Sequence, residues 1–146
     1  VHIAHEEGFK VMSHTNTARA VIDAAKAGVD SIEHGNYQSL ESIQCMREEN
    51  VVWVPTVVTV KNLIGCGRYP DGVLKDIWKI QQDGLRMAWK EGVQIALGSD
   101  AGAFMVPHGI GIRDEYQALC TVLGETEALK KHLEQGEKRI RGFYNQ

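Results

Sequence analysis

Short apolar runs alternate along the chain with longer segments in which apolar side chains recur at helical spacing. The runs of strand length cover about residues 9–13, 29–33, 51–57 and 93–97. The segments with helical spacing predict helices over about residues 17–27, 39–50, 73–91, 112–123 and 125–143. Strand–helix alternation of this kind predicts an α/β fold, with about four parallel strands covered by helices and further helices at the C-terminal end.

Capping residues mark the boundaries of these elements. Ser39 precedes a helical pattern as an expected N-cap, with Ser42 at the third helical position. Gly28 and Gly92 each end a helical pattern. The segment 2–8 has the pattern of the last turns of a helix that ends at glycine, so we expect the chain to be a fragment that begins inside an element.

Composition and charge narrow the class of protein. The chain has 146 residues, 43% of them hydrophobic, and a net charge of −3, which suits one folded domain. Basic residues do not alternate with aromatic ones, so nucleic acid is not an expected partner. Apolar stretches stay below the ~18 residues of a membrane span, so a membrane is not an expected partner either. The three separated cysteines and the polar start of the chain predict reduced thiols and a cytoplasmic location.

Three candidate metal ligands follow strand-like runs. His14 and His34 come after the first and second runs, and Asp100 comes after the fourth. The carboxyl ends of parallel strands meet at one rim of a sheet, so these side chains are expected to converge. Imidazole and carboxylate suit zinc and related divalent ions. A single such residue is often an ordinary loop residue, but three in register favour a metal site.

The residues around these ligands resemble a known family. The segments around His14, Ile32-Glu33-His34-Gly35 and 97–102 (Leu-Gly-Ser-Asp-Ala-Gly) resemble the C-terminal half of the amidohydrolase superfamily, with the closest likeness to imidazolonepropionase-related enzymes and to metal-dependent dipeptidases of the prolidase and arginine carboxypeptidase types. The resemblance covers most of residues 1–112. It implies that residues 1–146 are the C-terminal portion of a metal-dependent hydrolase, a partial (β/α)8 TIM-type barrel equivalent to strands five to eight.

The resemblance also implies residue roles. His14 and His34 would follow strands five and six as metal ligands, and Asp100 would be both the strand-eight ligand and the catalytic general acid/base. A divalent metal, expected to be zinc, with one or two ions in the complete enzyme, would activate water for attack on the C–N bond of a small amide, cyclic amide or dipeptide. In single-metal members the histidine that matches His34 contacts substrate instead.

Parts of the family's site are absent from this chain. The His-x-His motif after strand one and the strand-four lysine or glutamate would lie upstream of Val1. Three ligands without these partners should hold metal weakly, so the isolated chain is expected to be inactive or weakly active.

Other polar residues receive separate predictions. His108 lies in the loop after Asp100, and loops at that position face a barrel's active site, so it is a candidate substrate-binding residue. Glu33 is expected to point away from His34, toward a helix, as a structural residue. Glu115 is expected to be solvated on its helix.

Two alternative interpretations stay open. The chain could be a non-catalytic half-barrel module for binding or assembly, because four strands in an open sheet expose two edges and one inner face. It would then form a homo-oligomer or associate with the missing N-terminal half. A doubly wound nucleotide-binding fold fits the alternation, but no glycine fingerprint follows the first strand.

Overall fold

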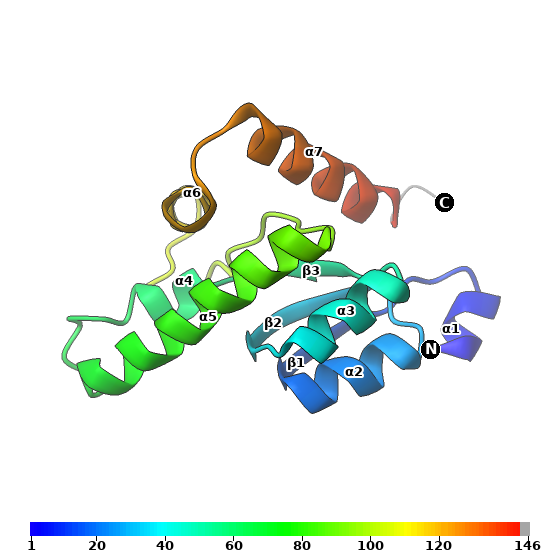
Figure 1. The fold of residues 1–146 in the computed structure, drawn as a ribbon, viewed down its shortest axis with the longest axis horizontal. Helices are drawn as coiled ribbons and strands as arrows, with labels where there is room; N and C mark the ends of the chain where they lie inside the picture. The colour runs from blue at the N-terminus through cyan, green and yellow to red at the C-terminus, as the bar shows by residue number, and fades with distance from the viewer. Residues whose placement is uncertain (144–146) are drawn as a thin grey trace.

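A three-stranded parallel sheet lies at the centre of the molecule, with helices on both of its faces (Figure 1). The computed structural model describes residues 1–143. The strands, in the order β1-β2-β3, are β1 (Met12–Thr17), β2 (Ser31–Tyr37) and β3 (Val52–Val54). The helices are α1 (His2–Glu6), α2 (Ala18–Lys26), α3 (Leu40–Glu48), α4 (Val58–Lys61), α5 (Asp71–Glu91), α6 (Ile110–Leu123) and α7 (Glu127–Gly142). None of these described helices has the length and apolar character to cross a membrane.

The predicted fourth strand is wrong as a full strand. Segment 93–97 lies beside β3 but makes one isolated parallel bridge, between Trp53 and Ile95. The bridge consists of a hydrogen bond from Trp53 N to Gln94 O (2.9 Å) and one from Ala96 N to Trp53 O (2.9 Å). Pro55 follows β3 directly and has no N–H to donate, so the ladder that a fourth strand would extend stops after three residues.

The first two strands begin later than predicted and continue beyond the histidines. The carboxylate of Asp30 accepts a hydrogen bond from Val11 N (2.8 Å), and Val11 O accepts one from Asp30 N (2.8 Å). This link fixes the chain just before the ladder, whose first pair is Met12 with Ser31. The polar side chains of His14 and His34 do not end these strands, because the hydrogen bonds of a ladder join backbone groups.

Helix boundaries agree closely with the capping residues. Ser39 Oγ accepts a hydrogen bond from Ser42 N (3.2 Å), and Ser42 Oγ accepts one from Ser39 N (2.9 Å), which forms a reciprocal capping box. Gly92 ends α5 in the left-handed conformation, with φ 75°. The short helix α4 was not predicted, because its four residues continue a β-branched run that is typical of strands.

The main core lies between one face of the sheet and helices α2, α3 and α5, which cross that face (Figure 1). Ile32, Trp53 and Ile95 point from the strands into this layer and are at most 1% exposed. The helices contribute apolar side chains, including Val21, Ala25, Ile43, Met46, Leu85 and Ala88. The amphipathic pattern of these helices therefore determines one covered face of the sheet.

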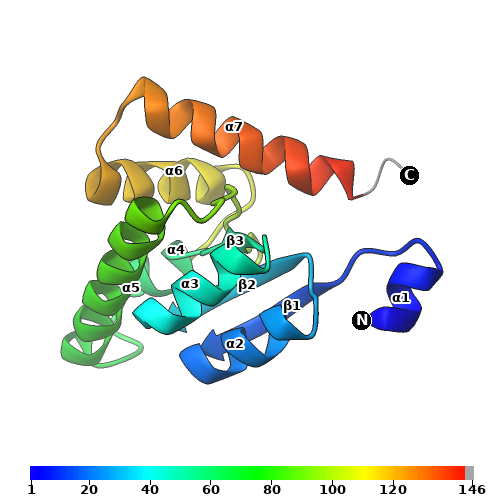
Figure 2. The ribbon, with the colours of Figure 1, turned by 45° about the vertical axis from the view of Figure 1, so that its right-hand side comes forward.

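Helix α7 lies on the β3 side of the molecule, away from α2 (Figure 2), and it covers part of the opposite face and one edge of the sheet. Ile140 and Phe143 pack against Val52, Val54 and Ala96. Ile95 N, which points away from β3, donates a hydrogen bond to His132 Nε2 (2.9 Å). Burial lowers the pKa of His132, against an opposing hydrogen bond with the Val93 backbone, so near pH 7 the ring is neutral and able to accept. This bond helps to close the sheet edge beside segment 93–97, and within residues 1–143 β1 is the other edge strand of the sheet.

Candidate functional site

His14 and His34 lie in contact on neighbouring strands. Their ring centroids are 4.5 Å apart, with an interplanar angle of 72° in an edge arrangement. His34 pairs in register with Thr15, the residue after His14, so the β1–β2 ladder itself places the two imidazoles side by side. The structure therefore brings together two of the three predicted ligands, from positions inside the strands.

Three hydrogen-bonding and conformational features hold His34 in place. Its backbone has φ 70°, which breaks the alternation of side chains along β2. The indole of Trp53 donates to His34 O (2.7 Å), and Thr56 Oγ1 lies 2.6 Å from His34 Nδ1. Burial lowers the pKa of His34, His14 lowers it further, and Asp100 acts in the opposite direction. The ring is thus kept neutral near pH 7, as a metal or substrate contact requires.

Asp100 lies on the exposed loop after segment 93–97, with φ 55°. Its charge acts to raise the pKa of both His34 and Glu33, so it lies within electrostatic range of both residues, although burial still keeps the pKa of His34 below its usual value. Within residues 1–143, however, no three His, Cys, Asp or Glu side chains form a group that could hold a metal ion. The described residues supply two imidazoles and a nearby carboxylate, but they do not form a complete ligand set.

His108 is exposed in the same loop as Asp100. Its Nε2 atom lies 3.6 Å from the position that a Cβ would take on Gly102, so the ring lies close to the chain two residues after Asp100. This placement puts His108 on the Asp100 loop, and its contact with substrate stays a prediction.

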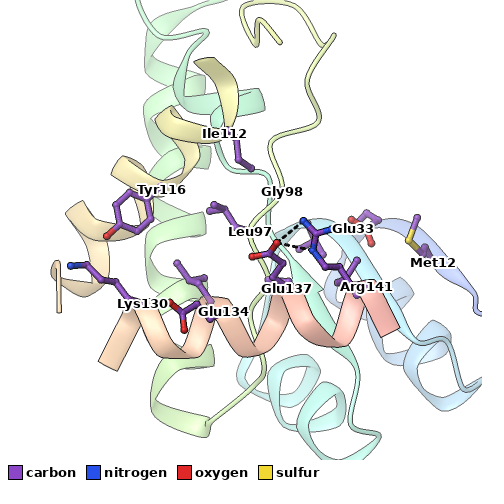
Figure 3. A pocket seen from close by; sticks show the side chains of 14 residues that line it. Met12, Glu33, Leu97, Gly98, Ile112, Tyr116, Lys130, Glu134, Glu137 and Arg141 are labelled. Atoms are coloured by element: carbon purple, nitrogen blue, oxygen red, sulfur yellow. Dashed lines mark hydrogen bonds and ion pairs between the residues drawn. The ribbon is translucent and has the colours of Figure 1, made fainter. Parts of the chain in front are cut away.

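A cavity of about 710 Å³ lies between the sheet, α6 and α7 (Figure 3). Its apolar lining comes from Met12 on β1, Val54 on β3, residues 96–98 and the helices α6 and α7. Its charged lining residues are Glu33 on β2 and four residues of α7, Lys130, Glu134, Glu137 and Arg141. Glu33 lines this cavity together with residues of α7, and it pairs in register with His14. Burial raises its pKa, Asp100 adds to the rise, and the hydroxyl of Ser31, which donates to Glu33 (2.8 Å), opposes it.

The prediction that Glu115 is solvated is wrong. Its side chain is fully buried on α6, where Oε1 accepts a hydrogen bond from Val57 N (3.0 Å) and Oε2 accepts one from Val58 N (2.9 Å). Glu115 shares the helical face of Ala118 and Leu119, both fully buried. That spacing was the available signal in the sequence, because residues three and four apart lie on one face of a helix.

Known proteins match most of this chain in sequence and in fold. An uncharacterized protein of Mycobacterium tuberculosis is 33% identical over 122 residues, which cover 80% of this chain and 32% of the relative. The solved structure of a Xaa-Pro dipeptidase with bound methionine matches with a TM-score of 0.63 and 28% identity, over 92% of this chain and 36% of that one. Aspergillus niger ochratoxinase matches with a TM-score of 0.77 and 24% identity, over 91% of this chain and 30% of that one.

These matches describe a part of a larger fold. The chain spans about a third of the length of the relatives it matches. Its parallel strands and helices match part of the fold of Aspergillus niger ochratoxinase. The sequence pattern of the amidohydrolase family matches residues 1–131, which is most of the chain. By this match and by its fold, the chain belongs to the amidohydrolase family.

Proposed function

We propose that residues 1–146 are the C-terminal portion of a metal-dependent amidohydrolase, equivalent to barrel strands five to eight. The complete enzyme would hydrolyse a C–N bond in a small molecule or dipeptide. The observation that carries this proposal is the contact between His14 and His34 on adjacent parallel strands, with the charge of Asp100 acting on His34. Family membership supports the reaction class.

The substrate class is supported by the solved relatives. One of them is a Xaa-Pro dipeptidase, and another is a prolidase complexed with N-methylphosphonate-L-proline, at 28% and 29% identity. A dipeptide or similar amide is therefore the first substrate to try. In this proposal His14, His34 and Asp100 are ligands of a divalent metal, expected to be zinc, Asp100 also exchanges the proton, and His108 contacts substrate.

The isolated chain should bind metal weakly and show little or no turnover. Metal affinity depends on a nearly complete and pre-oriented ligand shell. The described residues bring two imidazoles together without a third ligand in the same group.

Zinc titration by calorimetry tests this proposal. We expect one weak site in the full chain, lost in His14→Ala, His34→Ala and Asp100→Asn. The control is His2→Ala, because His2 is exposed on α1 and pairs there with Glu6 (3.2 Å). Zinc binding that survives all three site substitutions would contradict the ligand assignment. Full zinc occupancy with rapid hydrolysis of Xaa-Pro dipeptides by the chain alone would contradict the incomplete site.

A second candidate function is a non-catalytic half-barrel module. The lack of a three-ligand group within residues 1–143 favours it, and so does β1, which ends the sheet on one side. Such a module would form a homo-oligomer or bind the N-terminal half of a barrel through this edge. Light scattering over a range of concentrations distinguishes the two: a chain that stays monomeric argues against self-assembly.

A further inference from the structure

We propose that Thr56 and Glu115 are positioning residues for His34. Thr56 would hold the ring through Nδ1 so that Nε2 faces the ligand, and Glu115 would hold the turn that carries Thr56. This inference rests on the proposed role of His34 in the site. It adds two residues that the ligand pattern in the sequence does not indicate, one from the turn after β3 and one from α6.

The first step is the hydrogen bond between Thr56 Oγ1 and His34 Nδ1, at 2.6 Å. Thr56 is 3% exposed, so water competes little for its hydroxyl. With Nδ1 engaged, Nε2 is the nitrogen left for a cation or a substrate. A nitrogen that binds a cation must be unprotonated, so the required tautomer is the one in which Nδ1–H donates to Thr56 Oγ1.

The second step is the backbone conformation of Thr56. Its φ is 48°, in the left-handed region, which is strained for a β-branched residue. Strain of this kind persists where the surrounding structure holds the residue, and it is concentrated at functional sites. The hydroxyl of Thr59 donates to Thr56 O (2.9 Å), which anchors the turn on its own side.

The third step is the carboxylate of Glu115, which anchors the same turn from α6. Its two oxygens accept hydrogen bonds from Val57 N and Val58 N, the two backbone N–H groups that follow Thr56. Glu115 is fully buried. A buried carboxyl group is costly to leave without hydrogen bonds, so these two bonds tie the turn after β3 to α6.

A separate hydrogen bond holds the backbone of His34. The indole of Trp53 donates to His34 O, so the backbone of His34 is fixed while Thr56 fixes its ring. Gly35 follows with φ 67°, and a Cβ at that position would lie 3.1 Å from Trp53 Nε1. The backbone and the ring of His34 are therefore each held by a hydrogen bond.

The test uses the full, metal-free chain and nitrogen chemical shifts of its histidine rings, which report the tautomer. We expect His34 to be the Nδ1–H tautomer in the wild type and in Thr56→Ser, which keeps the hydroxyl. Thr56→Val should shift His34 toward the Nε2–H form. The matched control is Thr121→Val, because Thr121 is exposed on α6 and its hydroxyl donates to Gln117 O (2.8 Å). Circular dichroism checks that each variant folds.

An Nε2–H tautomer in the wild type would overturn the role of Thr56. An unchanged His34 ring in folded Thr56→Val would do the same.

The role of Glu115 is tested in the wild type by hydrogen exchange, with no risk of misfolding. The Val57 and Val58 amides should exchange at least a hundredfold more slowly than in an unstructured peptide. Exchange near the peptide rate would remove Glu115 from the proposal.

Zinc affinity separates this inference from the proposed function. If the wild type binds zinc through His34, Thr56→Val should weaken binding about tenfold to a hundredfold, as for other residues that orient metal ligands. A wild type that binds no zinc would contradict the proposed function, while the ring tautomers would still decide whether Thr56 positions His34. If Thr56→Val changes neither the zinc affinity nor the tautomer of His34, this inference is overturned and the proposed function stands.

Discussion

At the scale of single residues, burial dominates the electrostatics of Glu115. Burial raises its pKa to about 7, although hydrogen bonds from Val58 and Val57 and the charge of Lys61 all act to lower it. Desolvation therefore outweighs three favourable contacts. A carboxyl with a raised pKa binds its proton more tightly in the folded protein than in the unfolded chain, so it links stability to pH.

The contribution of Glu115 to the free energy of unfolding should fall as pH rises from about 4.5 to about 7. The folded state holds the Glu115 proton over this range and the unfolded state has lost it, so the stabilisation present at low pH disappears as pH passes the folded pKa. The loss amounts to at most about 3 kcal/mol for this group. Urea unfolding at several pH values measures it.

Glu115→Gln isolates the contribution of this carboxyl, because the amide does not titrate. The variant should be less stable by about 1–3 kcal/mol, since one of the two backbone N–H groups loses its acceptor, and its stability should vary less with pH. A pH dependence equal to that of the wild type would assign the effect to other groups.

At the scale of elements, α7 combines three ways of holding the sheet. Leu129 and Leu133 pack into the main core, His132 accepts the free N–H of Ile95, and Gly136 lies against the backbone of segment 93–97. A Cβ at Gly136 would lie 2.8 Å from Ala96 Cα and would collide with Ile95 O. Glycine at this position allows the helix to approach the strand, at a cost in helix propensity.

Gly136→Ala should destabilise the protein even though alanine favours helix formation by about 1 kcal/mol over glycine. The added Cβ meets backbone atoms, which cannot move aside as a flexible side chain can. Gly142→Ala is the matched control, because Gly142 is in the same helix and a Cβ there has no atom within 4 Å. Thermal unfolding should show a lower Tm for Gly136→Ala and an unchanged or higher Tm for Gly142→Ala. Equal effects would show that α7 does not pack closely on the strand.

At the scale of the whole molecule, the two edges of the sheet differ. The edge beside segment 93–97 is closed by α7, while β1 has a neighbour on one side only within the described residues. The face that carries Val52, Val54 and Ala96 is covered by Ile140 and Phe143. Because uncovered apolar faces and strand edges favour association, the C-terminal part of α7 should limit self-association of this chain.

Ile140→Asp should increase self-association. A charge at Ile140 weakens the packing of α7 on Val52, Val54 and Ala96, so this apolar face becomes available to a second molecule. Gln135→Asp adds the same charge at an exposed position of α7 and serves as the control. Light scattering should show a mass that rises with concentration for Ile140→Asp alone. A rise in both variants would point to the charge change instead.

The sequence by itself determined most of the helices and indicated the family. Local signals such as the Ser39 capping box and the glycine that ends α5 act over a few residues, and the motif around His34 resembles the amidohydrolases in sequence alone. The tertiary structure decided the rest. Pro55 limited β3 and reduced the expected fourth strand to one bridge, and α7 closed an edge and a face of the sheet. Glu115 is buried because it binds the backbone of a turn that lies 57 to 58 positions away in the sequence. Such features depend on contacts between distant segments, which local periodicity does not encode.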